Sequence, residues 1–181
     1  LGDLKNLTSR KSIKEIKHYL LWGGYPEPTL SKSETFRLDW QENYYDTYIN
    51  RDMRALFPRL DLIKYRRVVG MLASLSGTII NKSDIARSVE TSEKTCRDYL
   101  DIISGTFFWR DLEAFQTPKI KTTMKLPKGH FRDSGMALFL QNIHSVSDLN
   151  LFPRLGNTFE SFVIEEVIRG AESVDARNFR A

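Results

Sequence analysis

Residues 79–111, IINKSDIARSVETSEKTCRDYLDIISGTFFWRD, decide the fold. Ser83 is placed to cap a short helix that runs to Val89. A second helix is expected over Thr95–Ile103, where apolar residues recur at helical spacing. The intervening residues 90–92 have the composition of a turn followed by a helix cap. The stretch therefore predicts two short helices joined by a tight turn.

Strand-forming residues follow the second helix. Gly105 is expected to end that helix, and residues 106–112 are rich in aromatic and β-branched side chains. Ile120–Met124 and His130-Phe131 are the segments expected to pair with them. Two helices, a tight turn and a β-hairpin are the layout of a winged helix-turn-helix.

Helices are also expected before this module. Ser12 begins one that Gly23-Gly24 stops, and Ser33 begins a longer one that continues to Pro58. Aromatic residues repeat every fourth position along the longer helix: Phe36, Trp40, Tyr44 and Tyr48. A third helix has its apolar stripe between Tyr65 and Leu75, and Gly77 is placed to end it in a left-handed conformation.

The remainder of the chain is expected to be helical and to lead into an α/β region. Asp133 and Ser134 can cap a helix, and a last amphipathic helix is expected to end near Gly170. The sequence thus predicts a mainly α fold: a helical segment over 1–58, a winged helix-turn-helix with a small β-wing over 59–125, and a truncated α/β portion over 126–181.

The composition of the 181 residues favours a soluble protein of the cytoplasm. Cys96 is the single cysteine, so an intrachain disulfide is excluded, and the apolar run at residues 107–109 is far shorter than a membrane span. The net charge of +4 is a weak indication of an anionic partner. Its distribution is more informative, because residues 117–132 hold only basic charges and the end of the chain is acidic.

Several ordered motifs together resemble a known family. They are Gly23-Gly24-Tyr25-Pro26-Glu27, the helix with Trp40, Tyr44, Tyr48 and Arg51-Asp52, the helix-turn-helix Asn81–Leu100, Leu126-Pro127-Lys128, Phe131-Arg132-Asp133-Ser134-Gly135-Met136, and Gly156 with Phe159-Glu160-Ser161-Phe162-Val163. This order is similar to the uncharacterised C-terminal domain of prokaryotic predicted ATPases of the AAA type. The resemblance implies an ATPase module before this chain and a region similar to restriction endonucleases after it.

The chain itself is expected to be a non-catalytic piece excised from such a protein. No G-x-x-x-x-G-K-[ST] motif occurs, so ATP and Mg²⁺ are expected only in the ATPase module and no cofactor or metal is expected here. Of the acidic residues that the endonuclease-like region would supply, only Glu160 is represented. One helical glutamate cannot hold Mg²⁺ tightly.

The sequence predicts DNA-binding residues in the second helix of the winged helix and in its wing. They are Ser92, Lys94, Thr95 and Arg97 in the helix, and Lys119, Lys121 and Lys125 in the wing. The alternative is that the module serves packing or protein contact, because Glu93, Asp98 and Asp101 dilute the charge of the helix. The lysines equally suit a solvated hairpin edge.

Other features have a structural interpretation beside a functional one. The two glycines before Pro26 favour a helix stop over a binding loop, and Asp133 is most simply a helix cap. Arg51-Asp52 and Arg54 suit a surface salt bridge better than an arginine that reaches a neighbouring phosphate. Cys96 is expected in the core.

Two main functions remain open at this point. The first is a segment that binds double-stranded DNA and orients the ATPase module on it, mostly through phosphate contacts. The second is a regulatory docking platform, in which residues 36–56 and the winged helix contact the ATPase module of the parent chain or a partner protein. A nuclease completed beyond residue 181 ranks last, and no membrane partner is expected.

Overall fold

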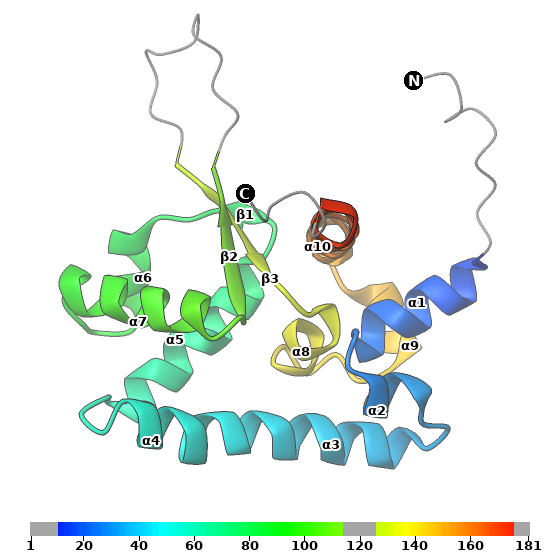
Figure 1. The fold of residues 1–181 in the computed structure, drawn as a ribbon, viewed down its shortest axis with the longest axis horizontal. Coiled ribbons are helices and arrows are strands. Elements are labelled where there is room, and N and C mark those ends of the chain that lie inside the picture. Colours follow the sequence, from blue (N-terminus) through cyan, green and yellow to red (C-terminus); the bar gives the residue numbers. More distant parts are fainter. Residues whose placement is uncertain (1–10, 114–125, 176–181) are drawn as a thin grey trace, which may run out of the picture.

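The computed structural model describes residues 11–113 and 126–175, with the side chains of 173–175 left out. The fold is mainly helical with one small antiparallel sheet, as the sequence predicts (Figure 1). The helical elements are α1 (Ile13–Trp22), α2 (Pro26–Leu30), α3 (Glu34–Thr47), the π-helical segment Tyr48–Met53, α4 (Arg54–Leu56), α5 (Leu62–Leu75), α6 (Lys82–Ser88), α7 (Glu93–Gly105), α8 (Ser134–Phe139), α9 (Val146–Leu151) and α10 (Leu155–Asp175). The strands are β1 (Thr78–Ile79), β2 (Trp109–Leu112) and β3 (Lys128–Phe131).

Helix α1 has the expected start and stop, but a short helix follows it that the sequence analysis does not include. Ser12 and Glu15 form a capping box at the start of α1, and Gly23 ends it at a φ of 77°. Pro26 then occupies the first turn of α2, where a missing N–H is tolerated. The run expected to be only a turn therefore also contains α2.

The long helix expected from Ser33 to Pro58 is interrupted. Ser33 caps α3 as predicted, but the backbone widens into a π-helix over Tyr48–Met53 before α4. The hydroxyl of Tyr48 lies 2.6 Å from that of Tyr65 and 2.8 Å from that of Thr106. The π segment thus brings a polar side chain of the long helix into contact with α5 and the end of α7.

The central helices and strands follow one another in the order α5, β1, α6, α7, β2, β3. The sheet has the order β1-β3-β2, with Thr78 opposite Gly129 and Trp109 opposite Phe131. Pairing of His130-Phe131 with the strand after α7 is confirmed, whereas β1 is an additional strand. The expected strand Ile120–Met124 lies outside the described residues.

The cap of α6 differs from the expectation, whereas α7 ends at Gly105 as predicted. Asn81, not Ser83, caps α6, because the Asn81 side chain accepts a hydrogen bond from the Ser83 backbone N–H. Gly105 is the last helical residue of α7, and the left-handed conformation after it belongs to Phe107, at a φ of 65°. Gly77, by contrast, has the predicted left-handed conformation after α5.

The last part of the chain packs against the central module. Strand β3 pairs with both β1 and β2, so the sheet crosses the expected boundary between residues 125 and 126. Asp133 caps α8 as predicted, and α10 continues to Asp175, past its expected end near Gly170. No strand follows β3 within residues 132–175, so the described part of this region contributes helices rather than a sheet of its own.

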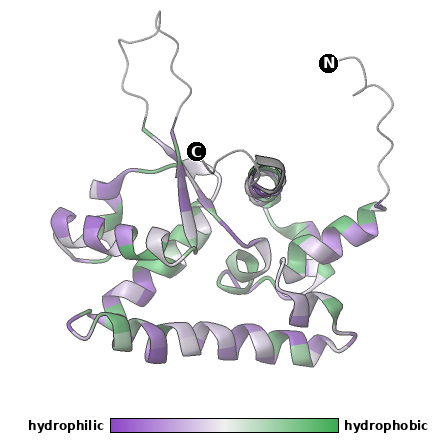
Figure 2. Ribbon diagram, in the orientation of Figure 1, coloured by the Kyte–Doolittle hydropathy of each residue, from purple (hydrophilic) through white to green (hydrophobic). Residues whose placement is uncertain are grey.

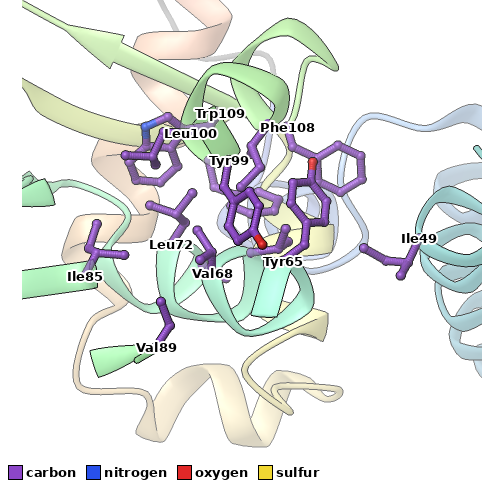
Figure 3. Close-up of a cluster of buried hydrophobic side chains, with 14 of the residues drawn as sticks. Ile49, Tyr65, Val68, Leu72, Ile85, Val89, Tyr99, Leu100, Phe108 and Trp109 are labelled. Carbon is purple, nitrogen blue, oxygen red and sulfur yellow. The ribbon is translucent and has the colours of Figure 1, made fainter. Parts of the chain in front are cut away.

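Two apolar clusters hold these elements together. The larger joins the π segment, α5, α6, α7, β2 and α8, and Figure 3 shows the inward side chains of Tyr65, Leu72, Leu100 and Trp109 within it. The smaller joins Leu20, Leu21 and Trp22 of α1 to α8 and α9. Apolar and hydrophilic residues are interspersed along the helices, as amphipathic packing requires (Figure 2).

Candidate nucleic-acid interface

The residues predicted to bind DNA lie at the beginning of α7. Ser92 is the N-cap, and its side chain accepts a hydrogen bond from the Thr95 backbone N–H at 3.0 Å. The two hydroxyls are 2.8 Å apart. Cys96, in the next position, is completely buried and burial raises the pKa of its thiol, so this side of the turn faces the core as expected. Lys94 and Arg97 lie on the exposed side.

The exposed face of α7 carries charges of both signs. Lys94 makes no hydrogen bond or ion pair with any described residue, whereas Arg97 lies 3.4 Å from the carboxylate of Glu93. Asp98 and Asp101 are exposed farther along the same helix. The basic side chains of α7 are therefore confined to its first turns, and of the two only Arg97 has an ion-pair partner among the described residues.

The wing lysines Lys119, Lys121 and Lys125 lie outside the described residues. The strands that flank them are described, and Leu112 pairs with Lys128 at the last registered position of the hairpin. Lys128 itself lies 2.5 Å from the carboxylate of Glu160 on α10.

An open groove runs along one side of α7. It has a volume of about 530 Å³ and lies between Thr95, Asp98 and Ile102 of α7 and the segment from Leu56 to Leu60. Leu56 and, on the next helix, Ile63 are exposed by 64% and 70%. Two aromatic residues of α3 are engaged elsewhere, since Trp40 and Tyr44 stack on each other and both contact the ring of Tyr25 at a tilt.

Two of the motifs that carry the family resemblance, Gly23-Gly24 and residues 131–136, meet at one junction around Asp133. Its carboxylate accepts hydrogen bonds from the backbone N–H groups of Gly24 and Met136, both at 2.8 Å. Desolvation raises the pKa of this carboxyl group, while the backbone donors oppose that shift. A Cβ atom at Gly23 would overlap the Asp133 carboxylate, and one at Gly135 would overlap the backbone of Trp22 and Gly23. The glycines are thus required by close packing of α1 against α8.

A buried ion-pair cluster adjoins this junction. Glu165 of α10 is 1% exposed and accepts hydrogen bonds from Arg110 of β2 at 2.6 Å and from Arg132 at 3.2 Å. This cluster is not among the features predicted from the sequence. A signal was available, since Glu165 recurs at helical spacing with Thr158 and Ser161 on the buried face of α10, where an acid requires a partner.

A second polar contact joins β3 to α10 inside the core. The Nδ1 atom of His130 lies 3.0 Å from the Ser161 hydroxyl, which lies 2.9 Å from the hydroxyl of Ser76. Burial lowers the pKa of His130, and its Nε2 atom has no hydrogen-bond partner among the described residues.

Other predicted features have the positions expected from their structural interpretation. Arg51 lies 2.8 Å from Asp52 in an exposed salt bridge.

Within residues 11–113 and 126–175, no group of at least three His, Cys, Asp or Glu side chains is arranged to hold a metal ion. In the same part of the chain, no helix combines the length and apolar character needed to cross a bilayer.

Residues 13–147 match the model of a family described as a domain of unknown function, DUF8612. The chain belongs to this family. It is also 30% identical over 169 residues to Uncharacterized protein Mb2031c of Mycobacterium bovis and to Uncharacterized protein Rv2008c of Mycobacterium tuberculosis. The match covers 92% of this DUF8612 chain but 38% of each relative. No solved structure matches the chain.

Proposed function

We propose that this DUF8612 chain is the winged-helix, DNA-binding segment of a longer protein whose ATPase module it orients on double-stranded DNA. One observation supports the proposal: the order α5, β1, α6, α7, β2, β3, with sheet order β1-β3-β2, is similar to that of a winged helix in which α6 and α7 form the helix-turn-helix. The parent's AAA-type ATPase rests on the sequence resemblance alone.

The distribution of charge supports contact with phosphates rather than with bases. Lys94 and Arg97 are exposed on the first turns of α7, the part of a recognition helix that enters the major groove. The Arg97–Glu93 pair is exposed, so exchanging it for a phosphate contact costs little. Asp98 and Asp101 lie farther along α7. They stay away from the DNA phosphates only when the helix enters the major groove by its N-terminal end.

Fluorescence anisotropy of a labelled random-sequence duplex over a salt series tests the proposal. The chain should bind saturably, and Lys94→Ala/Arg97→Ala should weaken binding about tenfold or more. The slope of log affinity against log salt should fall by roughly 2 when two phosphate contacts are lost.

A matched control removes the same charge elsewhere. Lys14→Ala/Lys32→Ala takes two exposed lysines from the α1–α3 end of the molecule and should leave the salt slope almost unchanged. If both double variants weaken binding equally, net charge rather than α7 attracts the duplex. Absence of binding at about 50 mM salt would refute DNA contact by this chain.

The groove beside α7 favours a second candidate, a docking platform for the parent's ATPase module. Exposed Leu56 lines this groove and exposed Ile63 lines the adjacent cavity that shares Phe57 and Leu60 with it, as expected for an apolar contact that needs a partner. In the full-length protein, Leu56→Ser/Ile63→Ser should then change the ATPase rate of the module. Binding of the duplex should stay intact. An unchanged ATPase rate would exclude this candidate.

A further inference from the structure

The last turn of α7 ends in a conformation that favours glycine, yet the residue there is Phe107. The Phe107 N–H donates to the Ser104 carbonyl and the Phe108 N–H donates to the Ile103 carbonyl, both at 3.1 Å. These two hydrogen bonds form a Schellman motif, in which the left-handed residue is usually glycine. A phenylalanine at a φ of 65° is strained in this position.

Burial of the side chain does not compensate for this strain. Phe107 is 73% exposed, whereas the neighbouring Phe108 is 5% exposed and belongs to the core. The guanidinium group of Arg132 lies over the Phe107 ring, 5.3 Å from the ring centroid. A strained and exposed aromatic residue is typical of a site kept for binding rather than for stability.

A cavity of about 240 Å³ lies beside the Phe107 ring. Tyr25, the backbone of Gly24, Arg132 and Arg169 also line it. The two carboxylates at its wall are already engaged: Glu165 accepts from Arg110 and Arg132, and Asp133 accepts from backbone N–H groups. We call this cavity the Phe107–Arg132 pocket.

The arginines leave donors available to an anion. Arg132 uses Nε to reach Glu165, and its terminal nitrogens make no hydrogen bond to any described residue. Arg169 is more engaged, because it uses Nε for the Glu165 carbonyl and one terminal nitrogen for Glu166 and also interacts with the Tyr19 hydroxyl. A planar guanidinium with two free nitrogens matches the oxygens of a phosphate.

We propose that the Phe107–Arg132 pocket binds a small organic phosphate that carries a flat ring. The phosphate contacts the terminal nitrogens of Arg132, with Arg169 beside it, and the ring stacks on Phe107. The small volume suits a phosphate and part of its substituent, while the exposed face of Phe107 receives the ring outside the cavity. The site is independent of the duplex-binding face, because the 13 residues of α7 place Ser92 and Phe107 about 20 Å apart.

Calorimetric titration with adenosine monophosphate, which joins a phosphate to a flat ring, tests the proposal on this chain. It should bind at least about tenfold more tightly than either adenosine or inorganic phosphate. Binding of inorganic phosphate as tight as that of the nucleotide would overturn the role of Phe107, and no binding of the nucleotide at millimolar concentration would overturn the site.

Phe107→Gly separates ligand binding from a structural role. Glycine removes the backbone strain, so the melting temperature should rise, while affinity for adenosine monophosphate should fall about tenfold because the stacking surface is lost. Unchanged affinity in this more stable variant would overturn the proposal. Phe36→Leu, which alters an exposed aromatic residue on α3, is the matched control and should bind the nucleotide normally.

Arg132→Lys tests the phosphate contact. The lysine keeps the positive charge beside Glu165 but lacks the paired nitrogens, so affinity for adenosine monophosphate should fall about tenfold while adenosine binding stays the same. Equal losses for both compounds would contradict a phosphate contact at Arg132.

Discussion

The Asp133 carboxylate accepts a hydrogen bond from the Gly24 backbone N–H at 2.8 Å, across 109 positions of sequence. This bond fixes the exit of α1 against the start of α8, where Asp133 also caps the helix. Asp133 therefore has two roles. The sequence predicts its role as the cap of α8 but not its long-range hydrogen bond with Gly24. The stability of the junction should depend on the space that the two glycines leave for this carboxylate.

Gly23→Ala should destabilise the protein by roughly 2 to 4 kcal/mol, because the new methyl group would overlap the Asp133 carboxylate at a backbone conformation suited to glycine. Urea denaturation measures the change. Gly70→Ala is the control: a Cβ at Gly70 meets nothing within 4 Å in α5, so this variant should gain about 0.5 to 1 kcal/mol. Equal effects of the two substitutions would contradict close packing at the junction.

Glu165→Ala should cost about 2 to 3 kcal/mol, because Arg110 and Arg132 lose the buried carboxylate that compensates their charges. Glu160→Ala breaks the exposed pair with Lys128 and should change stability by less than about 1 kcal/mol. Chemical denaturation midpoints distinguish the two. A loss at Glu160 as large as that at Glu165 would indicate that burial of the pair is not the cause.

Asn81→Ala should destabilise the chain by about 1 kcal/mol through loss of the α6 cap, whereas Ser83→Ala should have almost no effect. The Asn81 side chain accepts from the Ser83 N–H at 3.0 Å, and that backbone donor remains in the alanine variant of Ser83. Thermal denaturation of both variants checks the assignment, and the reverse order would restore Ser83 as the cap.

The stability of the fold should decrease as the pH falls below about 6.5, partly through His130. Burial holds the pKa of His130 below 6.5 in the folded state, so between the folded and unfolded pKa values the unfolded chain binds more protons. Acid therefore favours unfolding in this pH window. The loss of folding free energy is at most roughly 1.4 kcal/mol for each pKa unit between the folded and unfolded values. Above the unfolded pKa the contribution is constant.

His130→Gln removes the titrating group but keeps a polar side chain near Ser161. Denaturation midpoints measured from roughly pH 4.5 to 7.5 should fall less steeply in acid for this variant than for the unmodified chain. Parallel curves would mean that other groups, such as the carboxylates, cause the whole dependence.

Local sequence signals predict the first residue of a helix well where a single side chain caps its N-terminus. Ser12, Ser33, Ser92 and Asp133 begin helices as expected, since a side-chain oxygen followed by a helical pattern satisfies free backbone N–H groups. The π segment after Thr47 is not predictable in this way. Its sequence is an ordinary helical pattern, and the widening accompanies contacts of Tyr48 with Tyr65 and Thr106, which are distant in sequence.

Of the candidate DNA-binding residues, those on α7 could be placed from sequence because helical spacing separates buried Cys96 from exposed Lys94 and Arg97. The ion pair of Arg97 with Glu93 could be anticipated from their i, i+4 spacing. The pocket between Phe107, Arg132 and Arg169 could not be predicted, because it joins side chains from two connecting segments and α10, which are far apart in the sequence.

The sequence alone determined the mainly helical class and the succession of two helices and a hairpin, because caps, turns and periodicity act between residues a few positions apart. Tertiary structure decided that β1 joins the sheet as an additional strand beside β3, that Glu165 is buried between Arg110 and Arg132, and that Phe107 occupies a position suited to glycine. The physical reason is distance along the chain: these outcomes depend on burial and pairing among segments that meet only after the fold closes.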